Sequence, residues 1–213
     1  MRIALVYPPT SELDIKGYSL GLAYLCASLN KRHEVDVYNY NGKEFNKSIR
    51  LFLSSIKIKK PDLVGISFNS FNRQGAFKLL KQIKKIDKKI FVVLGGVHPA
   101  TLYVQIFKYF YNDVDFIIQS EGEISLPMLC QALETGGELS LISGLVYKDK
   151  SGGIIANRVS NLVKNLDDLP LPDYSYVAEE IKQKEIGYLI TSRGCPVNCE
   201  RAYEFSGKNR GRS

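Results

Sequence analysis

Long hydrophobic runs are missing from this sequence of 213 residues. No stretch approaches the roughly 18 consecutive apolar residues of a membrane-spanning helix, so we expect no membrane span. The first residues, MRIALVYPPTSELD, pass from a short apolar run directly into turn-forming residues and carry no cleavage pattern of a secretory signal. The sequence therefore favours a cytoplasmic protein.

Cysteine is scarce, and its four copies are too few for the disulfide framework of a small secreted protein. Cys195 and Cys199 lie close together in one short motif. Cys26 and Cys130 fall within predicted helices, and we expect them in the core. This usage fits a reducing compartment.

Acidic residues are outnumbered, and the formal net charge is +7. Residues 78–89, KLLKQIKKIDKK, hold six lysines and one aspartate, with apolar residues at helical spacing between them. This pattern is typical of a helix that packs its apolar side on a core and leaves its lysines in solvent. We therefore assign the basic charge to a solvated helix face and expect no nucleic-acid partner.

Apolar residues make up 45% of the chain and charged residues 24%, as in soluble globular proteins. Short runs rich in Val, Ile, Phe and Tyr predict strands at residues 3–7, 35–40, 63–68, 90–94 and 116–118. Longer stretches predict helices at residues 18–31, 43–58, 100–110, 125–135, and from Asn72, a plausible cap, into the lysine-rich segment. The alternation predicts a doubly wound α/β domain, Rossmann-like or flavodoxin-like, with a five-stranded parallel sheet.

The pattern changes after the last predicted helix, which should stop at Gly136-Gly137, and three segments are expected. Residues 1–137 form the α/β domain. Residues 138–185 contain GLVYKDKSGGIIANR, which predicts a β-hairpin, and NLDDLPLPDYSY, which suits an extended connector. Residues 186–213 begin with a new apolar run and continue into TSRGCPVNC.

Open parallel sheets bind ligands beyond the carboxyl ends of their strands, so the loops at that edge indicate the ligand. A dinucleotide-binding protein needs G-x-G-x-x-G after the first strand, where this sequence has YPPTSELDIKG. A Walker phosphate loop and the acidic cluster of a phosphoacceptor receiver are missing as well. The sequence disfavours these three classes.

Small and polar residues occupy these loops instead. They are Ser67, Asn69, Ser70, Gly95, Gly96, His98, Ser120, Gly122 and Glu123. Two adjacent glycines let a bulky planar or chain-like group lie against the backbone, although a simple tight turn explains them equally well. His98 is either a hydrogen-bonded first-turn residue or a cofactor contact, and His33, at a helix end, is expected to be structural.

Six sequence elements, taken in order, resemble the cobalamin-binding domain at the amino end of B12-dependent radical S-adenosylmethionine proteins. They are IALVYPP, DLVGISFNS, VVLGGVHPA, QSEGE, DLPLPDY and TSRGCPVNC. The resemblance covers essentially the whole chain and implies cobalamin as the cofactor. The cofactor-binding residues that it implies are Pro8, Pro9, Thr10, Ser67, Asn69, Ser70, Gly95, Gly96, His98, Ser120, Glu121, Gly122 and Glu123.

The loop after the first strand departs from one branch of this family. In the methionine-synthase-like branch of B12 domains, a D-x-H-x-x-G loop supplies an axial histidine to cobalt. Ser67 and the Gly95-Gly96 pair match positions of that branch, but no histidine stands between Pro8 and Tyr18. The resemblance therefore implies cobalamin in a base-off form, without histidine from the first loop.

The cysteine motif is incomplete. Radical S-adenosylmethionine enzymes carry C-x-x-x-C-x-x-C, whose three thiolates hold a [4Fe–4S] cluster that binds S-adenosylmethionine. Cys195 and Cys199 match the first two positions, and Ala202 stands at the third. A zinc site is not expected, because too few nitrogen and sulfur ligands cluster nearby. The cluster and S-adenosylmethionine are therefore expected only in an intact parent protein.

The resemblance thus implies that this chain is the cobalamin-binding region, with the start of a radical S-adenosylmethionine barrel, of such a protein. By resemblance, the parent is a methyltransferase or a ring-forming enzyme similar to magnesium-protoporphyrin IX monomethyl ester cyclase. Because the third thiol and the rest of the barrel are missing through Ser213, we expect this chain to be catalytically incomplete. The alternative is a non-catalytic α/β interaction module that has lost cobalamin binding.

Overall fold

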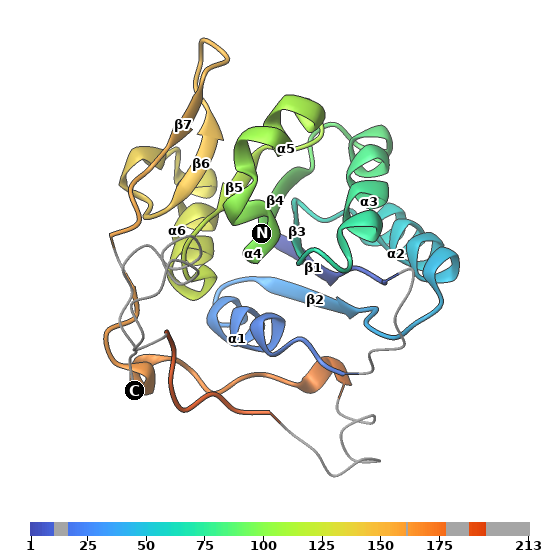
Figure 1. Cartoon of the computed structure of the whole chain (residues 1–213), viewed down its shortest axis with the longest axis horizontal. Coiled ribbons are helices and arrows are strands. Elements are labelled where there is room, and N and C mark those ends of the chain that lie inside the picture. Colours follow the sequence, from blue (N-terminus) through green and yellow to red (C-terminus); the bar gives the residue numbers. More distant parts are fainter. Residues whose placement is uncertain (11–16, 161, 178–187, 195–213) are drawn as a thin grey trace.

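A computed structural model describes residues 1–10, 17–160, 162–177 and 188–194 of the chain. Its strands form one mixed sheet in the order β2-β1-β3-β4-β5-β6-β7 (Figure 1). They are β1 (Arg2–Tyr7), β2 (Glu34–Asn39), β3 (Leu63–Ser67), β4 (Phe91–Gly95), β5 (Phe116–Ile118), β6 (Leu145–Lys148) and β7 (Ile154–Ala156). Strands β1 to β5 run parallel to one another, and β6 and β7 are antiparallel additions at one edge.

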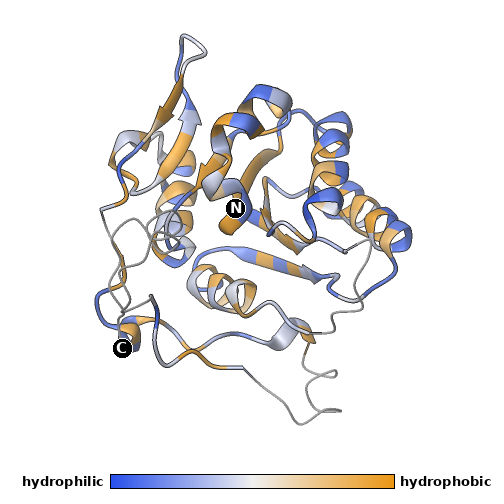
Figure 2. Cartoon of the chain, in the orientation of Figure 1, coloured by the Kyte–Doolittle hydropathy of each residue, from blue (hydrophilic) through white to orange (hydrophobic). Residues whose placement is uncertain are grey.

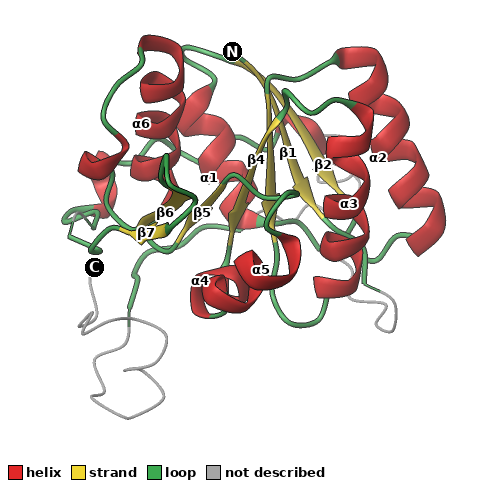
Figure 3. Cartoon of the chain, turned by 90° about the horizontal axis from the view of Figure 1, so that it is seen from above, coloured by secondary structure: helices red, strands yellow, loops and turns green. Residues whose placement is uncertain are grey.

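Helices cover both faces of the sheet, with α1 and α6 on one side and α2, α3 and α5 on the other (Figure 3). They are α1 (Leu20–Leu29), α2 (Phe45–Lys59), α3 (Arg73–Ile86), α4 (Val97–Thr101), α5 (Tyr103–Phe110) and α6 (Gly122–Thr135). Short 3-10 helices at Leu139–Leu141, Leu166–Asp168 and Ser175–Val177 lie in the connecting segments. None of the helices in the described ranges is long and apolar enough to cross a membrane.

Alternation along the strands divides the core into two layers. Ile3 and Leu5 of β1 pack with α1 and α6, whereas Ala4 and Val6 pack with α2 and α3. Hydrophobic residues accordingly lie along the strands and on the inner sides of the helices (Figure 2). The doubly wound α/β fold predicted from the sequence is confirmed.

Two helix predictions differ from the structure. The helix expected over residues 100–110 is two helices, α4 and α5, which meet at Leu102. Helix α6 begins at Gly122, three residues early, because the Glu121 carbonyl accepts hydrogen bonds from the N–H groups of Ile124 and Ser125. This helix ends where the glycine pair predicts, with Gly136 in the left-handed region at a φ of 71°.

The predicted hairpin is present, but it continues the sheet instead of standing beside it. Strand β6 pairs with β5, which places Val146 opposite Ile117, and the N–H of Gln119 donates to the Gly144 carbonyl at 2.8 Å. The five predicted parallel strands are present, and the hairpin adds two antiparallel strands to the same sheet. Pairing with β6 satisfies the backbone of β5, which would otherwise be an open edge.

The connector crosses the outer side of α1 (Figure 1). The N–H of Asp173 donates to the Ala23 carbonyl at 3.0 Å, and the Tyr176 hydroxyl donates to the Ser19 carbonyl at 3.0 Å. Nδ2 of Asn30 donates to Oδ2 of Asp173 at 2.6 Å. Helix α1 is therefore covered by the sheet on one side and by the connector on the other, which explains its nearly uniform apolar character.

The lysine-rich side of α3 is solvated as predicted, with one exception. Nζ of Lys84 lies 2.6 Å from Oδ2 of Asp115 and donates to the Ile90 carbonyl at 2.7 Å. The same carboxylate oxygen accepts the N–H of Val92 at 2.7 Å. The lysine and aspartate side chains are only 14% and 21% exposed. This ion pair ties the end of α3 to β4 and to the start of β5.

Candidate ligand-binding site

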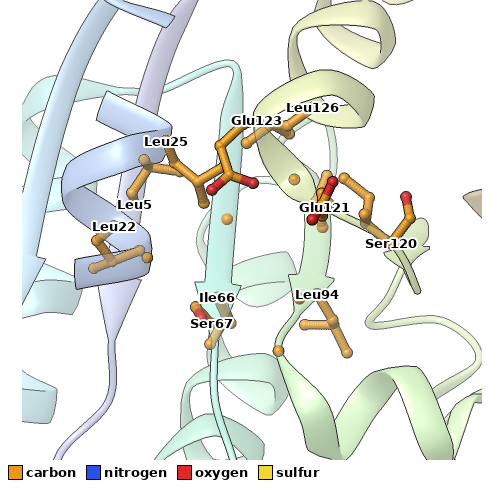
Figure 4. A pocket seen from close by; sticks show the side chains of 17 residues that line it. Leu5, Leu22, Leu25, Ile66, Ser67, Leu94, Ser120, Glu121, Glu123 and Leu126 are labelled. Atoms are coloured by element: carbon orange, nitrogen blue, oxygen red, sulfur yellow. The ribbon is translucent and has the colours of Figure 1, made fainter. Parts of the chain in front are cut away.

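The strand order reverses between β1 and β3, because the chain moves from β1 to β2 on one side and later to β3 on the other. Doubly wound sheets bind ligands at such a switch point, beyond the carboxyl ends of the strands. A cavity of about 230 Å³ lies there, between the sheet and helices α1 and α6 (Figure 4). Its position matches the edge at which the sequence predicts a site.

The cavity has apolar walls, a floor of small residues and an acidic rim. Its apolar walls are Leu5, Leu22, Leu25, Val93, Ile118 and Leu126. Ile66 and Leu94 also border it, although they belong to the core layer on the other face of the sheet. Its small residues are Gly21, Gly65, Ser67, Gly95, Gly96, Ser120 and Gly122, and its carboxylates are Glu121 and Glu123. Such a lining suits a flat apolar group that is flanked by hydrogen-bond donors.

The adjacent glycines Gly95 and Gly96 serve different needs. A Cβ atom on Gly96 would lie 2.5 Å from the Phe68 carbonyl oxygen, and the φ of Gly96 is 95°, so the backbone itself requires glycine there. Among the described residues, a Cβ atom on Gly95 would meet no atom within 4 Å. Packing therefore does not require glycine at position 95, and its missing side chain keeps the cavity open.

A third glycine, Gly65, lies within β3 on the same side of the sheet. A Cβ atom there would come within 2.7 Å of Cδ2 of Leu5, so glycine allows that leucine to pack across β3. Helix α6 also approaches α1 closely, because a Cβ atom on Gly122 would lie 2.8 Å from Cδ2 of Leu25. These two glycines set the width of the cavity between the helices and the sheet.

The predicted site residues fall into two groups. Those that line the cavity are Ser67, Gly95, Gly96, Ser120, Glu121, Gly122 and Glu123. Those that lie outside its lining are Pro8, Pro9, Thr10, Asn69, Ser70 and His98. The first group comes from the ends of β3, β4 and β5, and the second belongs to loops that continue past the same edge of the sheet.

His98 packs among aromatic rings on the other face of the sheet. Its ring centroid lies 5.5 Å from that of Phe68 and 6.0 Å from that of Phe77. Its Nδ1 atom lies 3.1 Å from Oγ of Ser70. Burial lowers the pKa of His98, and the nearby charge of Arg73 lowers it further, so the ring is neutral near pH 7.

Asparagine side chains fasten the loops after β1 and β3 to each other. Nδ2 of Asn72 donates to the Pro8 carbonyl at 3.2 Å, and Oδ1 of Asn72 accepts the N–H of Asn69 at 2.9 Å. Asn72 precedes α3 as predicted, but its side chain does not cap that helix. Nδ2 of Asn69 donates to the hydroxyl of Tyr7 at 3.1 Å. Burial raises the pKa of Tyr7, and hydrogen bonds from both asparagines oppose that rise.

The acidic rim is paired with an arginine from far along the chain. Nη2 of Arg193 lies 2.6 Å from Oε1 of Glu123, and Nη1 lies 3.5 Å from Oε1 of Glu121. The guanidinium carbon lies 5.2 Å from the centroid of the Tyr24 ring. Figure 4 shows the Glu123 side chain pointing into the cavity. The rim is therefore charged but locally balanced.

The cysteines described by the structure are core residues, as predicted. Cys26 in α1 and Cys130 in α6 are both buried. Burial raises the pKa of Cys26 to about 11 and that of Cys130 to about 12, so neither thiol ionises near pH 7. Among the described residues, no group of three His, Cys, Asp or Glu side chains is placed to hold a metal ion. Cys195, Cys199 and Ala202 lie outside the described residues.

Several lining residues were missed by sequence reasoning. Gly65 interrupts the apolar strand DLVGISF, and a glycine inside a strand commonly marks a close approach of backbone or ligand. Gly21 is an exposed glycine in the first turn of an otherwise buried helix, which is a similar signal. Leu25 and Leu126 carried no signal, because sequence does not show which side of an apolar helix faces a cavity.

Comparison with known proteins points to one family. Residues 10–129 match the family model of the B12 binding domain. The chain is 31% identical to an uncharacterized methyltransferase of Pyrococcus horikoshii, over 100% of this chain and 48% of the relative. It is 26% identical to the anaerobic magnesium-protoporphyrin IX monomethyl ester cyclase of Rubrivivax gelatinosus, over 93% of this chain and 38% of the relative. The chain thus spans less than half the length of these relatives.

Solved structures share the fold. The cobalamin-dependent S-adenosylmethionine radical enzyme OxsB, with aqua-cobalamin and S-adenosylmethionine bound, matches with a TM-score of 0.77 and 24% identity, over 92% of this chain and 27% of that chain. The radical S-adenosylmethionine methyltransferase TsrM from Kitasatospora setae matches with a TM-score of 0.70 and 18% identity, over 100% of this chain and 43% of that chain. At these identities the likeness establishes the fold alone.

Proposed function

The chain belongs to the B12-binding domain family, and we propose that it binds cobalamin at the cavity between α1, α6 and the sheet. One observation carries the proposal: the family match includes the switch point of the sheet, and the cavity there is kept open by Gly95, which packing does not require to be glycine. The relatives place the domain among proteins related to cobalamin-dependent radical S-adenosylmethionine enzymes.

The cavity fits one part of cobalamin. Pockets for drug-sized ligands usually measure roughly 300–1,000 Å³, so a cavity of about 230 Å³ does not enclose a corrin ring. Cobalamin also carries a nucleotide tail that ends in a flat, apolar benzimidazole, whereas its other side chains end in amides. Because leucine, valine and isoleucine dominate the walls, we place the benzimidazole in the cavity.

The corrin ring then lies outside, over the ends of β3 and β4. Phe71 lies in the loop that follows β3, and Val97 is the first residue of α4, which follows β4. These two residues are 64% and 57% exposed. Exposed apolar side chains beside a cavity are typical of a binding surface. The ring would cover these residues, and the paired asparagine loops would hold the edge of the sheet in place beneath it.

This arrangement implies cobalamin in a base-off form. A benzimidazole inside the cavity is not available to cobalt, and the chain has only two histidines. His98 packs among Phe68 and Phe77. Nδ1 of His33 lies 3.3 Å from the amino group of Met1, which precedes β1 at the amino ends of the strands, away from the cavity. The first loop holds no histidine in its sequence. We therefore propose base-off cobalamin without a histidine ligand.

In a longer protein, this domain would serve methyl transfer or radical ring formation, as the names of its relatives suggest. A [4Fe–4S] cluster and S-adenosylmethionine would belong to that protein. With Ala202 at the third motif position, this chain supplies two of three cluster thiols, so we propose that it is catalytically incomplete by itself. In a full-length protein, Ala202→Cys should restore iron loading, and failure to do so would count against the cluster assignment.

The visible spectrum after desalting tests the proposed function. The purified chain is mixed with hydroxocobalamin, desalted, and scanned for cobalamin absorbance. Retained absorbance near one equivalent per chain is expected. Absence of retained cobalamin at high micromolar concentration would favour the alternative, a non-catalytic interaction module of the same fold.

A further inference from the structure

Two carboxylates at the rim of the cavity are largely withdrawn from water. The side chain of Glu121 is 12% exposed and that of Glu123 is 8% exposed. Removing carboxylates from water costs free energy unless a cation or several hydrogen bonds compensate them. The N-terminal turn of α6, where Glu123 lies, supplies part of that compensation through the helix dipole.

Arg193 supplies the rest of the compensation for these two carboxylates. Its side chain is 15% exposed, and its two terminal nitrogens are divided between Glu123 at 2.6 Å and Glu121 at 3.5 Å. The planar guanidinium also lies over Tyr24 of α1, at 5.2 Å from the ring centroid. One side chain therefore joins both helices that enclose the cavity, and a lysine has no comparable fork of donors.

Glu121 links a further segment to this group. While Oε1 of Glu121 faces Arg193, Oε2 accepts the N–H of Val163 at 2.5 Å. Val163 lies in the connector that continues across α1. The rim thus gathers α1, α6, the connector and the segment containing Arg193 at the mouth of one cavity.

The position of Arg193 in the sequence connects this group of charged side chains to the cysteine motif. Arg193 stands 70 residues after Glu123 and two residues before Cys195, the first thiol of the cluster motif. Its ion pairs therefore fix the chain that leads into the motif against the wall of the cavity. A group that fills the cavity contacts Glu121 and Glu123. Because both carboxylates are paired with Arg193, a shift of either one changes the position of the Arg193 side chain.

We propose that Arg193 is a positioning residue that couples occupancy of the cavity to the placement of the segment leading into the cysteine motif. The proposal rests on cobalamin binding at this cavity. Because such coupling is reciprocal, cobalamin should tighten the Arg193 contacts, and these contacts should strengthen cobalamin binding by the same factor. Couplings of this kind are commonly of the order of 5- to 150-fold, and we expect about tenfold here.

The test compares Arg193→Met with Arg50→Met, which removes an exposed arginine from α2, far from the cavity. Hydroxocobalamin affinity and hydrogen exchange of peptides covering residues 188–194 are measured for the full chain and for both variants. We expect Arg193→Met to weaken affinity about tenfold and to abolish the protection that hydroxocobalamin gives this segment. Arg50→Met should behave as the unmodified chain.

A cycle of Arg193→Met, Glu123→Gln and the double variant separates the ion pair from direct ligand contacts. If the pair carries the coupling, the double variant should bind about as weakly as Arg193→Met alone. Unchanged affinity and protection in Arg193→Met, with hydroxocobalamin still bound, would overturn the coupling alone. If the unmodified chain binds no hydroxocobalamin, both the coupling and the proposed function fail. In that case, faster exchange of residues 188–194 in ligand-free Arg193→Met would show that the Arg193 ion pairs only hold this segment in place.

Discussion

Ser67 and Gly95 lie opposite each other in register at the ends of β3 and β4, and both line the cavity under α1 and α6. Residues paired in a parallel sheet project to the same face. At this point the cavity floor therefore carries one small side chain, that of Ser67, and no side chain at Gly95. The gap at Gly95 makes the floor sensitive to a single added methyl group.

Gly95→Ala should therefore weaken hydroxocobalamin binding by about tenfold or more, because one misplaced methyl group in an apolar pocket commonly costs roughly 1–3 kcal/mol. The free energy of unfolding should differ from that of the unmodified chain by less than about 0.5 kcal/mol, since the added Cβ meets no atom of the described residues within 4 Å. Gly137→Ala, beyond the far end of α6, is the control for binding and should bind normally, although its added Cβ would lie 3.3 Å from Cα of Ala132. Equal affinity in both variants would contradict a cavity floor at Gly95.

Gly21→Ala separates stability from binding at the same cavity. Alanine favours a helix over glycine by up to about 1 kcal/mol, so the variant should unfold at a slightly higher urea concentration. Because Gly21 lines the cavity, the same change should lower hydroxocobalamin affinity. A variant that is more stable and binds at least as tightly would show that this part of α1 does not contact the ligand.

The base-off form is tested by electron paramagnetic resonance of the reduced, Co(II) state. Neither His33 nor His98 lines the cavity in the part of the chain that the structure describes, and the benzimidazole is placed inside it. The spectrum should therefore show no nitrogen splitting from an axial ligand. Splitting from a coordinated nitrogen, removed by His98→Phe, would instead place that histidine beneath cobalt.

Lys84→Met should destabilise the fold by about 2 kcal/mol, because it leaves the partly buried carboxylate of Asp115 without its cation. The same change at Lys85, one residue along the same helix and exposed, should alter stability by less than about 0.5 kcal/mol. Urea unfolding of the two variants measures the difference. Similar stabilities would mean that the ion pair contributes little to the attachment of α3.

Asp173 makes the attachment of the connector depend on pH. Burial would raise the pKa of Asp173, but hydrogen bonds from Ser175, Cys26 and Asn30 lower it below its usual value. A carboxylate with a lowered folded pKa stabilises the fold above its unfolded pKa of about 4, and this stability is lost as pH falls through the folded value. Asp173→Asn should thus be less stable than the unmodified chain at pH 7, and the gap should close towards pH 2.

The control for that experiment is Asp167→Asn, which changes an exposed aspartate of the same connector. It should unfold at the same urea concentration as the unmodified chain at pH 7. A gap between Asp173→Asn and the unmodified chain that stays constant from pH 7 to pH 2 would show that the carboxylate charge is not what holds the connector on α1.

Much of the fold could be predicted from the sequence, because the buried strands are continuous apolar runs and helices α2, α3 and α5 carry a clear amphipathic period. The extension of the sheet by β6 and β7 was not predicted, since local patterns do not show that β5 has a free edge for β6. Lys84 was likewise grouped with its solvated neighbours, because its partner, Asp115, lies 31 residues away.

The candidate site was predictable at the strand ends, where Ser67, Gly95 and the loop from Ser120 to Glu123 follow buried runs. The part of the site that α1 and α6 form, and the contacts of Arg193, were not predictable. Sequence alone does not show that an arginine beside a cysteine motif packs over Tyr24 of the first helix. Tertiary contacts between distant segments decide these features.

Cobalamin binding at this cavity is tested most directly by a hydroxocobalamin titration of the unmodified chain and of Gly95→Leu. Visible absorbance follows the binding, and circular dichroism confirms that both proteins are folded. We expect saturable binding of one cobalamin per unmodified chain and no saturation for Gly95→Leu, whose side chain would occupy the cavity. Equal binding by the two proteins, or no binding by the unmodified chain, would show that cobalamin does not occupy this cavity.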